Sequence, residues 1–370
     1  MHPSRVIIHA DFDYFYAQCE ERENPTLKNK PVVVCIYSGR NEDSGAVTTA
    51  NYIARKYGVK AGIPIIRAKR KLKDLDAAFL PANFELYERV SENIMSILRG
   101  YADKFEQMGI DEAFIDVTQK TEGNFENVKQ LAQKIQTEIL EKERITASFG
   151  IGSNKLVAKI AAGRQKPYGL TMVKPEEVES FLVPLPVDEL IGVGKKTATV
   201  MEELGIKTIG DLARFDLGKL VKRFGKLLGV YFHNSALGID ESPVQERGMA
   251  ESISRILTLK EDTKDLSKIL DEIYKICIDI HARAKALNLN FKSVSVYAVL
   301  QDMSAHSRSK TFETPTDDIE VLKETTKELF QRLLNDIPEE LKARRIGVKI
   351  ANFTTEKQTQ KQITEYVNKT

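Results

Sequence analysis

The chain has few of the features that mark secreted, zinc-binding or membrane-embedded proteins. Its 370 residues include only three cysteines, Cys19, Cys35 and Cys277, and no two of them form a C-x-x-C pair. The five histidines are scattered, so the sequence predicts neither a zinc site nor a disulfide framework. Asp11 and Asp13 break the apolar run near the N-terminus, which argues against a signal peptide. No stretch approaches the ~18 apolar residues of a membrane span, so we expect a cytoplasmic protein without a membrane partner.

An excess of charge of one sign is also missing. The chain carries 55 basic and 53 acidic residues, a formal net charge of +2, so any surface for a polyanion must be local. Two runs, residues 151–175 and residues 341–350, are basic and contain no acid. Each run alone is typical of a solvated face, but together they indicate contact with a polyanion. Their basic residues are Lys155, Lys159, Arg164, Lys166 and Lys174, and Lys342, Arg344, Arg345 and Lys349.

What is present is an ordinary globular composition, with 42% hydrophobic and 29% charged residues and a length that suits several domains. The first 172 residues alternate between β-branched runs and amphipathic stretches. This order predicts an α+β, palm-like sheet with a subdomain inserted at about residues 15–80. We expect strands at residues 5–10, 31–37 and 146–151, a two-stranded hairpin over 105–117, and helices at 14–22, 46–57, 86–101, 128–142 and 154–162.

The second half of the chain changes texture. Short helical patterns bounded by glycine follow residue 174 and form two units of helix–turn–helix size, at residues 190–206 and 209–225. Residues 238–248 are polar, contain a proline and predict a linker. Beyond the linker we expect a second small α/β domain and then a polar tail. Its helices are predicted at 266–286 and 322–334, and its strands at 294–300 and 345–351.

Three carboxylates occupy positions that suit metal-assisted phosphoryl transfer. Asp11 lies at the carboxyl end of the first predicted strand, and Asp111 and Glu112 lie together in the predicted hairpin. Two divalent ions roughly 3.5–4 Å apart need such carboxylates to bridge and neutralise them, and Mg²⁺ favours carboxylate oxygens. A plainer interpretation is that Asp11 and Asp13 cap the following helix and that Glu112 is a surface turn residue.

Longer stretches of sequence favour the metal interpretation. They are DFDYFYA at 11–17, VVVCIYSGRNEDSGAVTTANYIARKYGVKAGIP at 32–64, GIDEAFIDV at 109–117 and GIGSNKLVAKIAAGRQKPYGL at 150–170. In order and spacing they resemble the Y-family DNA polymerases of the DinB type, and archaeal members most closely. The resemblance covers nearly the whole chain. It departs at Gly109, where family members often carry serine before the Ile-Asp-Glu; neither residue is a metal ligand.

The resemblance implies a right-hand polymerase fold with a C-terminal α/β little-finger domain. The palm would comprise residues 1–14 and 81–172, and the fingers residues 15–80. The thumb, with helix–hairpin–helix units, would span 173–239, and a linker 240–250. The little finger would follow at 251–354 and a tail at 355–370. The implied function is template-directed DNA synthesis past damaged bases by a DNA-directed DNA polymerase that uses dNTPs and primer–template DNA.

Residue roles follow from the same resemblance. Asp11, Asp111 and Glu112 would hold two Mg²⁺ ions, for which Mn²⁺ can substitute, with help from the backbone carbonyl of Phe12. Backbone amides at a helix N-terminus would bind the triphosphate, and an adjacent tyrosine would act as a steric gate against a ribose 2′-hydroxyl. These residues are Tyr14, Phe15 and the gate Tyr16. An ordinary packed aromatic is the alternative for Tyr16.

Four more side chains would contact the β- and γ-phosphates, and Arg55 can do so with two hydrogen bonds. They are Thr49, Tyr52, Arg55 and Lys166, although Lys166 also fits a solvated lysine. Gly45 and Ala46 fall in the segment that would roof the templating base. Their small side chains leave room for distorted bases, and the chain has no spare acidic cluster or leftover domain. We therefore expect low fidelity and no 3′→5′ exonuclease.

Separate parts of the chain would hold DNA. Gly192 and Gly194, followed by Lys195, fit a hairpin whose backbone approaches a phosphate without reading sequence, although a plain helix connection has the same pattern. Arg344 and Arg345 resemble the little-finger strand that tracks the template backbone, where they would contribute salt-dependent affinity.

The C-terminal residues resemble a peptide that docks on sliding clamps. Gln360, Ile363 and Tyr366 match the Q-x-x-hydrophobic-x-x-aromatic pattern, but Val367 replaces the second aromatic residue. Such a tether would raise the effective concentration of a polymerase that otherwise acts as a monomer. A disordered tail without a partner is the alternative.

Two other protein classes share some of these features. A non-catalytic DNA-binding scaffold would need only the glycine hairpins and basic strands, and its carboxylates would be structural. Another palm-type nucleotidyl transferase, such as a cyclase or an RNA-making enzyme, would share the carboxylates. The combined set of carboxylates with Tyr52, Arg55 and Lys166 argues against the scaffold, and Tyr16 with the C-terminal domains argues against the second class.

Overall fold

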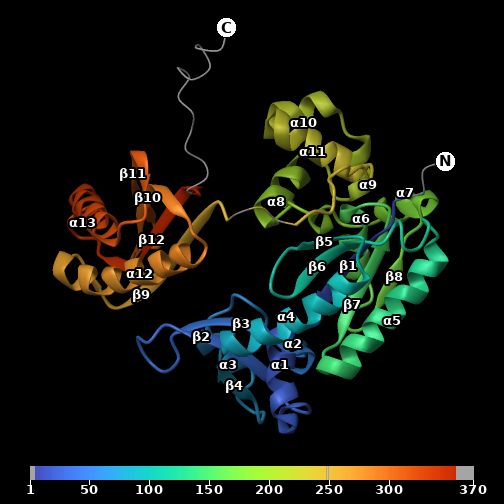
Figure 1. Ribbon diagram of the computed structural model, residues 1–370, viewed down its shortest axis with the longest axis horizontal. Helices are drawn as coiled ribbons and strands as arrows, with labels where there is room; N and C mark the ends of the chain where they lie inside the picture. The colour runs from blue at the N-terminus through green and yellow to red at the C-terminus, as the bar shows by residue number, and fades with distance from the viewer. Residues whose placement is uncertain (1–4, 247, 249, 356–370) are drawn as a thin grey trace. The chain divides into compact units, whose positions relative to one another are not determined.

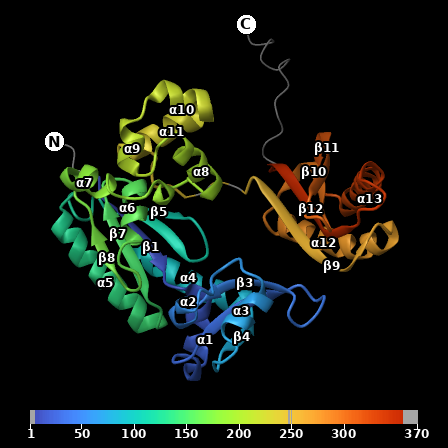
Figure 2. The same ribbon diagram turned by 180° about the vertical axis from the view of Figure 1, so that it is seen from behind.

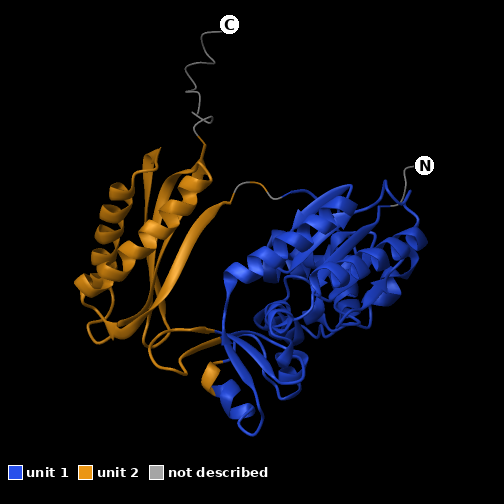
Figure 3. Cartoon of the chain, turned by 60° about the horizontal axis from the view of Figure 1, so that its bottom comes forward, with its two compact units in different colours: residues 1–35, 47–63, 67–247 blue, residues 36–46, 64–66, 248–370 orange. Residues whose placement is uncertain are grey.

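The computed structural model of the protein describes residues 5–246, 248 and 250–355 (Figure 1). Contacts divide the chain into two compact units (Figure 3). Unit 1 comprises residues 1–35, 47–63 and 67–247, and unit 2 comprises residues 36–46, 64–66 and 248–370. Among the described residues, no helix combines the length and apolar character that crossing a membrane requires.

A five-stranded sheet forms the centre of unit 1, and its order is β5-β6-β1-β7-β8. Strand β1 lies in the middle and pairs antiparallel with both β6 and β7 (Figures 1 and 2). Within the described part of this sheet, β7 and β8 are the one pair that runs parallel. The strands are β1 (Ile7–Phe12), β5 (Lys104–Gln107), β6 (Glu112–Asp116), β7 (Ala147–Gly152) and β8 (Leu170–Met172).

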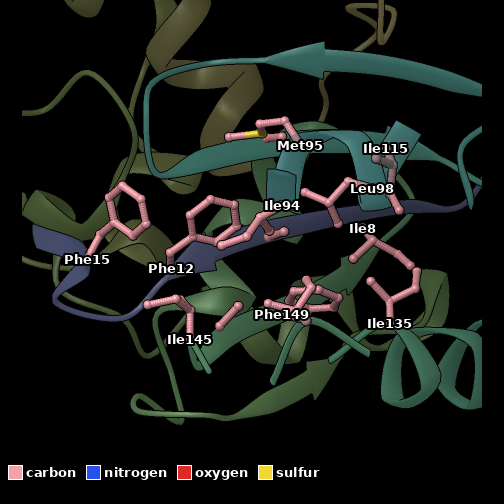
Figure 4. Packing of buried hydrophobic residues seen from close by; sticks show 14 of the residues in the cluster. Ile8, Phe12, Phe15, Ile94, Met95, Leu98, Ile115, Ile135, Ile145 and Phe149 are labelled. Atoms are coloured by element: carbon pink, nitrogen blue, oxygen red, sulfur yellow. The ribbon is translucent and has the colours of Figure 1, made fainter. Parts of the chain in front are cut away.

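The two faces of this sheet have different roles, because side chains alternate along each strand. Ile8 and Phe12 of β1 pack with residues of α4 and α5 in the largest core, as Figure 4 shows for Ile94 and Leu98 of α4. Ile7 faces the other way and packs with Ala158 of α6. His9 and Asp11 lie two and four residues after Ile7 and so share its face. The face covered by α6 therefore carries the polar residues. The helices are α4 (Phe84–Tyr101), α5 (Phe125–Glu143) and α6 (Lys155–Ala162).

A smaller, three-stranded sheet of order β3-β2-β4 corrects one sequence prediction. A helix was predicted over 46–57, but strand β3 runs to Ala50 and only then does helix α2 begin. Thr48 donates to the Val34 carbonyl at 3.0 Å, and the Asn51 side chain caps α2 by accepting from the Ala54 amide. The β-branched residues before Asn51 favour a strand. The elements here are α1 (Phe15–Glu23), η1 (Pro25–Leu27), β2 (Val32–Tyr37), β3 (Gly45–Ala50), α2 (Tyr52–Lys56), α3 (Ile65–Lys71) and β4 (Ala78–Pro81).

Short helices follow β8 and share their own apolar core, in agreement with the glycine-bounded pattern of the sequence. They are η2 (Pro175–Glu177), α7 (Val178–Leu182), η3 (Val187–Glu189), α8 (Lys195–Glu203), α9 (Ile209–Arg214), α10 (Leu217–Phe224) and α11 (Lys226–Ala236).

The polar segment after α11 is anchored over its first part. Asp240 accepts a hydrogen bond from the Leu156 amide at 3.1 Å, and Val244 is buried against Phe114 and Ala158. Residues 240–246, which were predicted to belong to a linker, therefore pack on unit 1.

Unit 2 contains a four-stranded antiparallel sheet of order β11-β10-β12-β9, with α12 and α13 packed on one face. Both helices and the strands β10 and β12 were predicted. The strands β9 and β11 were not, because their many exposed polar residues hide the alternation. The elements are β9 (Ser252–Thr263), α12 (Leu266–Ala286), β10 (Asn290–Leu300), β11 (Ala305–Thr316), α13 (Ile319–Asp336) and β12 (Ala343–Thr354).

Candidate active site

The three predicted carboxylates come together at one end of the central sheet. Asp11 lies directly opposite Glu112 in the β1–β6 register, so both side chains project from the same face. The Phe12 amide donates to the Asp111 carbonyl at 2.8 Å and ties the hairpin to the end of β1. Burial raises the pKa of Asp111, and the negative charges of Asp11 and Glu112 raise it further. The site therefore concentrates negative charge that a cation would relieve.

Two lysines compensate part of this charge. Lys166 Nζ lies 2.5 Å from Asp11 Oδ1, and Lys159 Nζ contacts Glu112 Oε2. His9 Nε2 lies 3.3 Å from the same Glu112 oxygen. The proximity of His9, with a further contribution from Lys159, lowers the pKa of Glu112 to about 2. Glu112 is therefore ionised at neutral pH.

These pairings bear on whether metal ions fit the site. Within the described part of the chain, no three His, Cys, Asp or Glu side chains are already arranged to coordinate a metal ion. Ammonium groups instead occupy oxygens of Asp11 and Glu112. The donor set itself suits a hard divalent cation, because it is made of carboxylate oxygens. The crowding of charge at Asp111 supports the same fit.

The first turn of α1 lies next to these carboxylates. Tyr14, which precedes α1, has a φ of 35°, and no side-chain hydrogen bond from a described residue caps the helix. Helix amides without a cap are suited to bind an anion. Tyr16 stacks on the buried Tyr87, with ring centroids 4.4 Å apart and 12° between the ring planes. Phe84 packs edge-on against both rings, so the orientation of Tyr16 is fixed by its neighbours.

The predicted phosphate ligands on β3 and α2 face the same region. The Tyr52 hydroxyl is buried and has no hydrogen-bond partner among the described residues. Burial raises the pKa of Tyr52, and the charge of Asp13 raises it further against the opposite effect of Arg55. The Tyr52 ring centroid lies 5.2 Å from that of Tyr14, which precedes α1. The Arg55 guanidinium lies 4.9 Å from the centre of the Tyr52 ring. Thr49 is part-buried on β3, next to this pair in sequence.

Asp13 has a role that sequence reasoning missed. It is only 1% exposed, and its carboxylate accepts from Ser148 Oγ at 2.7 Å and from the Tyr168 amide at 2.8 Å. Asp13 thereby holds the segment that carries Lys166 against the end of β1. The partners lie 135 and 155 residues away in sequence, so no local pattern could have indicated them.

Comparisons with known proteins agree with this geometry. The impB/mucB/samB family matches residues 10–163, its C-terminal domain matches residues 250–364, and a DNA polymerase-iota thumb domain matches residues 188–240. DNA polymerase IV of Nitrosopumilus maritimus is 44% identical over 364 residues, 98% of this chain and 99% of the relative. A solved Y-family DNA polymerase chimera, Dbh-Dpo4(243-245)-Dbh, matches with a TM-score of 0.89 and 41% identity, covering 95% of this chain and 99% of that chain. The chain belongs to the Y-family DNA polymerases.

Further relatives are consistent with this assignment. DNA polymerase IV of Methanosarcina acetivorans is 43% identical over 95% of this chain and 97% of its own length. A structure described as an insertion ternary complex of Dbh DNA polymerase has a TM-score of 0.68 and 40% identity, covering 95% of this chain and 99% of that chain. The fold is the predicted right-hand polymerase with a C-terminal little finger, and the enzyme is a DNA-directed DNA polymerase. Dependence on a divalent metal follows from membership of this family.

In this Y-family polymerase the predicted template roof has a structural constraint. Gly45 has a φ of 146°, and a Cβ there would lie 2.1 Å from the Ile36 carbonyl oxygen and 2.8 Å from Ile65 Cδ1. The backbone itself therefore requires glycine at this position. Ala46 is exposed and forms an isolated bridge with Pro64.

The predicted thumb hairpin contains a left-handed glycine and an open approach to the start of α8. Gly192 has a φ of 87°, and Gly194 precedes α8 with no neighbour within 4 Å of a Cβ placed there. The Tyr231 hydroxyl donates to the Ile191 carbonyl at 2.9 Å and braces the turn. Lys195 opens α8 and is exposed.

The two predicted little-finger arginines have different environments. Arg344 Nη2 lies 2.8 Å from Asp262 Oδ2, and its Nε lies 3.2 Å from Oδ1. Arg345 is exposed and lies opposite Thr258 and Val299 on the sheet face away from Ile346 and Val348, which are buried beneath the helices. Of these two arginines, Arg344 is therefore paired with Asp262 and Arg345 is not. The predicted clamp-binding residues Gln360, Ile363 and Tyr366 lie outside the described residues.

Proposed function

We propose that this enzyme copies DNA past damaged template bases by two-metal nucleotidyl transfer, with low fidelity and without a proofreading exonuclease. The observation that carries the proposal is the convergence of Asp11, Asp111 and Glu112 beside the unpartnered Tyr52 hydroxyl and Lys166. Two Mg²⁺ ions, for which Mn²⁺ can substitute, would clamp the attacking and leaving oxygens of the reaction. The Phe12 carbonyl would add a further oxygen ligand.

The protein's own side chains would bind and orient the dNTP. The uncapped amides of α1, from Tyr14 to Tyr16, would bind the triphosphate. The Tyr52 hydroxyl would gain a partner, which it lacks among the described residues. The positive charges of Arg55 and Lys166, with the Thr49 hydroxyl, would compensate the β- and γ-phosphates. The substrate charge is thereby neutralised next to the carboxylates.

Discrimination against ribonucleotides is assigned to Tyr16. Its ring cannot turn aside without losing the stack on Tyr87 and the edge contact with Phe84. A 2′-hydroxyl directed at a fixed ring is excluded by size, whereas a deoxyribose is not.

Tolerance of damaged bases is assigned to the roof at Gly45 and Ala46, because small side chains cannot press a template base into correct geometry. We assign the described helices and strands to palm, fingers, thumb and little finger. The proposed palm comprises residues 1–14 and 81–172, and the fingers residues 15–80. The thumb comprises residues 173–239 and the little finger residues 251–354.

DNA would be held by contacts that do not depend on sequence. The hairpin at Gly192, Gly194 and Lys195 would bind a backbone phosphate of the primer–template through main-chain amides. Arg345, and Arg344 once it is released from Asp262, would add electrostatic affinity. We propose that the enzyme is a monomer and that it binds a sliding clamp through Gln360, Ile363 and Tyr366.

Primer extension tests the proposed function. The wild-type chain should extend a primer with dNTPs and Mg²⁺, pass an abasic site and fail to remove a mismatched 3′ end. Asp111→Ala should abolish extension, because it removes a proposed metal ligand, while the control Glu92→Gln should not, because Glu92 is 68% exposed on α4. Accurate extension that stops at the lesion, or activity retained in Asp111→Ala, would contradict the proposal.

A further inference from the structure

His9 is an unusual residue for the centre of a sheet. It lies on β1 two residues before Asp11 and is 1% exposed. Its ring packs on Phe114, with centroids 4.5 Å apart, and burial lowers its pKa. Its Nε2 lies 3.3 Å from Glu112 Oε2 without the alignment of a hydrogen bond, and neither ring nitrogen has a hydrogen-bond partner among the described residues. The His9 ring is therefore held by packing, with its Nε2 beside the Glu112 carboxylate.

Lys159 reaches the same oxygen from a different element. It lies on α6, the helix that covers this face of the sheet, and its Nζ contacts Glu112 Oε2. Two groups from different elements therefore meet at one carboxylate oxygen. No hydrogen bond to the other oxygen, Oε1, is found within the described residues.

We infer that His9 and Lys159 are positioning residues that hold Glu112 Oε2, so that Oε1 is presented to the metal site. This inference rests on the proposed function of Glu112 as a metal ligand. A glutamate side chain has several rotatable bonds, and ordering it only when metal binds would cost affinity. Partners that orient a ligating carboxylate from outside the metal shell commonly change metal affinity by about 10–100-fold when removed.

The neighbouring turn of α6 provides a matched control. Lys155, four residues before Lys159, pairs with Glu106 of β5 at 2.9 Å. Lys155→Met removes the same charge from the same helix face, but its partner is not one of the proposed metal ligands. The two variants therefore separate the loss of a nearby positive charge from the loss of Glu112 orientation.

An electrostatic role and a positioning role for Lys159 predict opposite changes in metal affinity when the lysine is replaced. If Lys159 acted only through its charge, replacing it with methionine would remove a repulsive cation and tighten the binding of a divalent ion. If it positions Glu112, the same replacement weakens that binding. The sign of the change in metal affinity is therefore decisive.

The test measures metal binding directly in the assembled complex. The full chain is mixed with a dideoxy-terminated primer–template and the complementary dNTP, so that no reaction occurs, and bound Mn²⁺ is followed by electron paramagnetic resonance. We expect Lys159→Met to weaken Mn²⁺ binding by about 10-fold. Lys159→Arg, which keeps charge and donors, should restore it in large part, and Lys155→Met should leave it unchanged.

Kinetics provide a second measure. In extension assays the Mg²⁺ concentration for half-maximal rate should rise by about the same factor in Lys159→Met, while the KM for dNTP stays constant. Saturating Mg²⁺ should restore kcat. His9→Leu should act in the same direction, and His9→Gln, which keeps a hydrogen-bond donor, should be milder. If His9→Leu does not fold, the Lys159 variants still decide the question.

Several results would overturn the inference. Unchanged or tighter Mn²⁺ binding in Lys159→Met would show that the lysine does not position Glu112. A raised KM for dNTP with unchanged metal affinity would make Lys159 a phosphate ligand instead. Failure of the wild-type complex to bind Mn²⁺ at all would be a failure of the proposed function, and so is distinguishable from both.

Discussion

Asp262 restrains a predicted DNA contact, and releasing that contact should strengthen DNA binding. Its carboxylate on β9 pairs with Arg344 through two hydrogen bonds, and also with Arg40 of the same unit at 2.5 Å. While these pairs persist, neither guanidinium can neutralise a phosphate at full strength. Asp262→Asn removes the charge that holds them and keeps the shape of the side chain.

The expected gain follows from counterion release. Each arginine that reaches a DNA phosphate adds about 0.9 to the slope of log affinity against log salt. Asp262→Asn should therefore steepen the slope by about 0.9 if only Arg344 is released to the DNA, and by about 1.8 if Arg40 also takes part. Affinity should rise most at low salt, where the released cations displace the most counterions.

The same change should cost some stability. Asp262 is 19% exposed, so its two pairs are screened by solvent and contribute about 0.2–1 kcal/mol each. Hydrogen bonding from Arg344, with a further contribution from Arg40, lowers the pKa of Asp262. Because the folded-state pKa is depressed, this stability is present above the ordinary pKa of about 3.9 and is lost as the pH falls through the lowered value. The difference in stability between wild type and Asp262→Asn should therefore disappear in acid.

Fluorescence anisotropy of a labelled primer–template between 50 and 200 mM salt (roughly the range over which such slopes are measured) checks the prediction. Glu261→Gln is the control, because it removes one negative charge from the adjacent residue and frees only Lys268, its partner at 2.6 Å. An unchanged slope in Asp262→Asn would refute the reasoning. An equal increase in Glu261→Gln would attribute the effect to net charge instead of the released arginines.

Substitutions at three further positions test individual contacts of the site. Tyr16→Ala should raise kcat/KM for ribonucleotides by about 100-fold relative to dNTPs, and Tyr16→Phe should not, as measured by single-nucleotide insertion. Asp13→Ala leaves the Ser148 hydroxyl and the Tyr168 amide without acceptors, so it should lower the free energy of unfolding by about 2–5 kcal/mol in chemical denaturation; Asp13→Asn should cost much less. Tyr52→Phe should reduce kcat/KM for dNTP by about 10-fold without lowering the melting temperature, because its hydroxyl has no hydrogen-bond partner in the part of the chain that the structure describes.

Sequence patterns located the site where the information is local. A β-branched run predicted the first strand, and an acid at its carboxyl end faces an acid of the predicted hairpin because antiparallel neighbours share a face. Glycine at position 192 predicted a backbone turn, and its positive φ confirms one. In such cases a residue's conformational preference and its position in the chain are sufficient to predict the local structure.

The remaining contacts depend on tertiary structure. The partners of Asp13 come from β7 and from the segment before β8, and only the folded sheet brings them together. The adjacent arginines of β12 look equivalent in sequence, but a register irregularity between Ala343 and Arg345 sends Arg344 to Asp262 and leaves Arg345 on the open face. The sequence of β12 indicates neither the register irregularity nor the pairing of Arg344 with Asp262.

Lys166 connects substrate binding with the charge of the metal site. In the structure it pairs with Asp11, and it is also the side chain to which we assign the triphosphate. One ammonium group cannot neutralise both at full strength, so its transfer to the phosphates leaves the charge of Asp11 uncompensated. That charge then favours a cation at Asp11 when the dNTP is bound. The Lys166–Asp11 and Lys159–Glu112 pairs therefore offset part of the negative charge of the site, and under our proposal the arrival of the dNTP would remove the first of them.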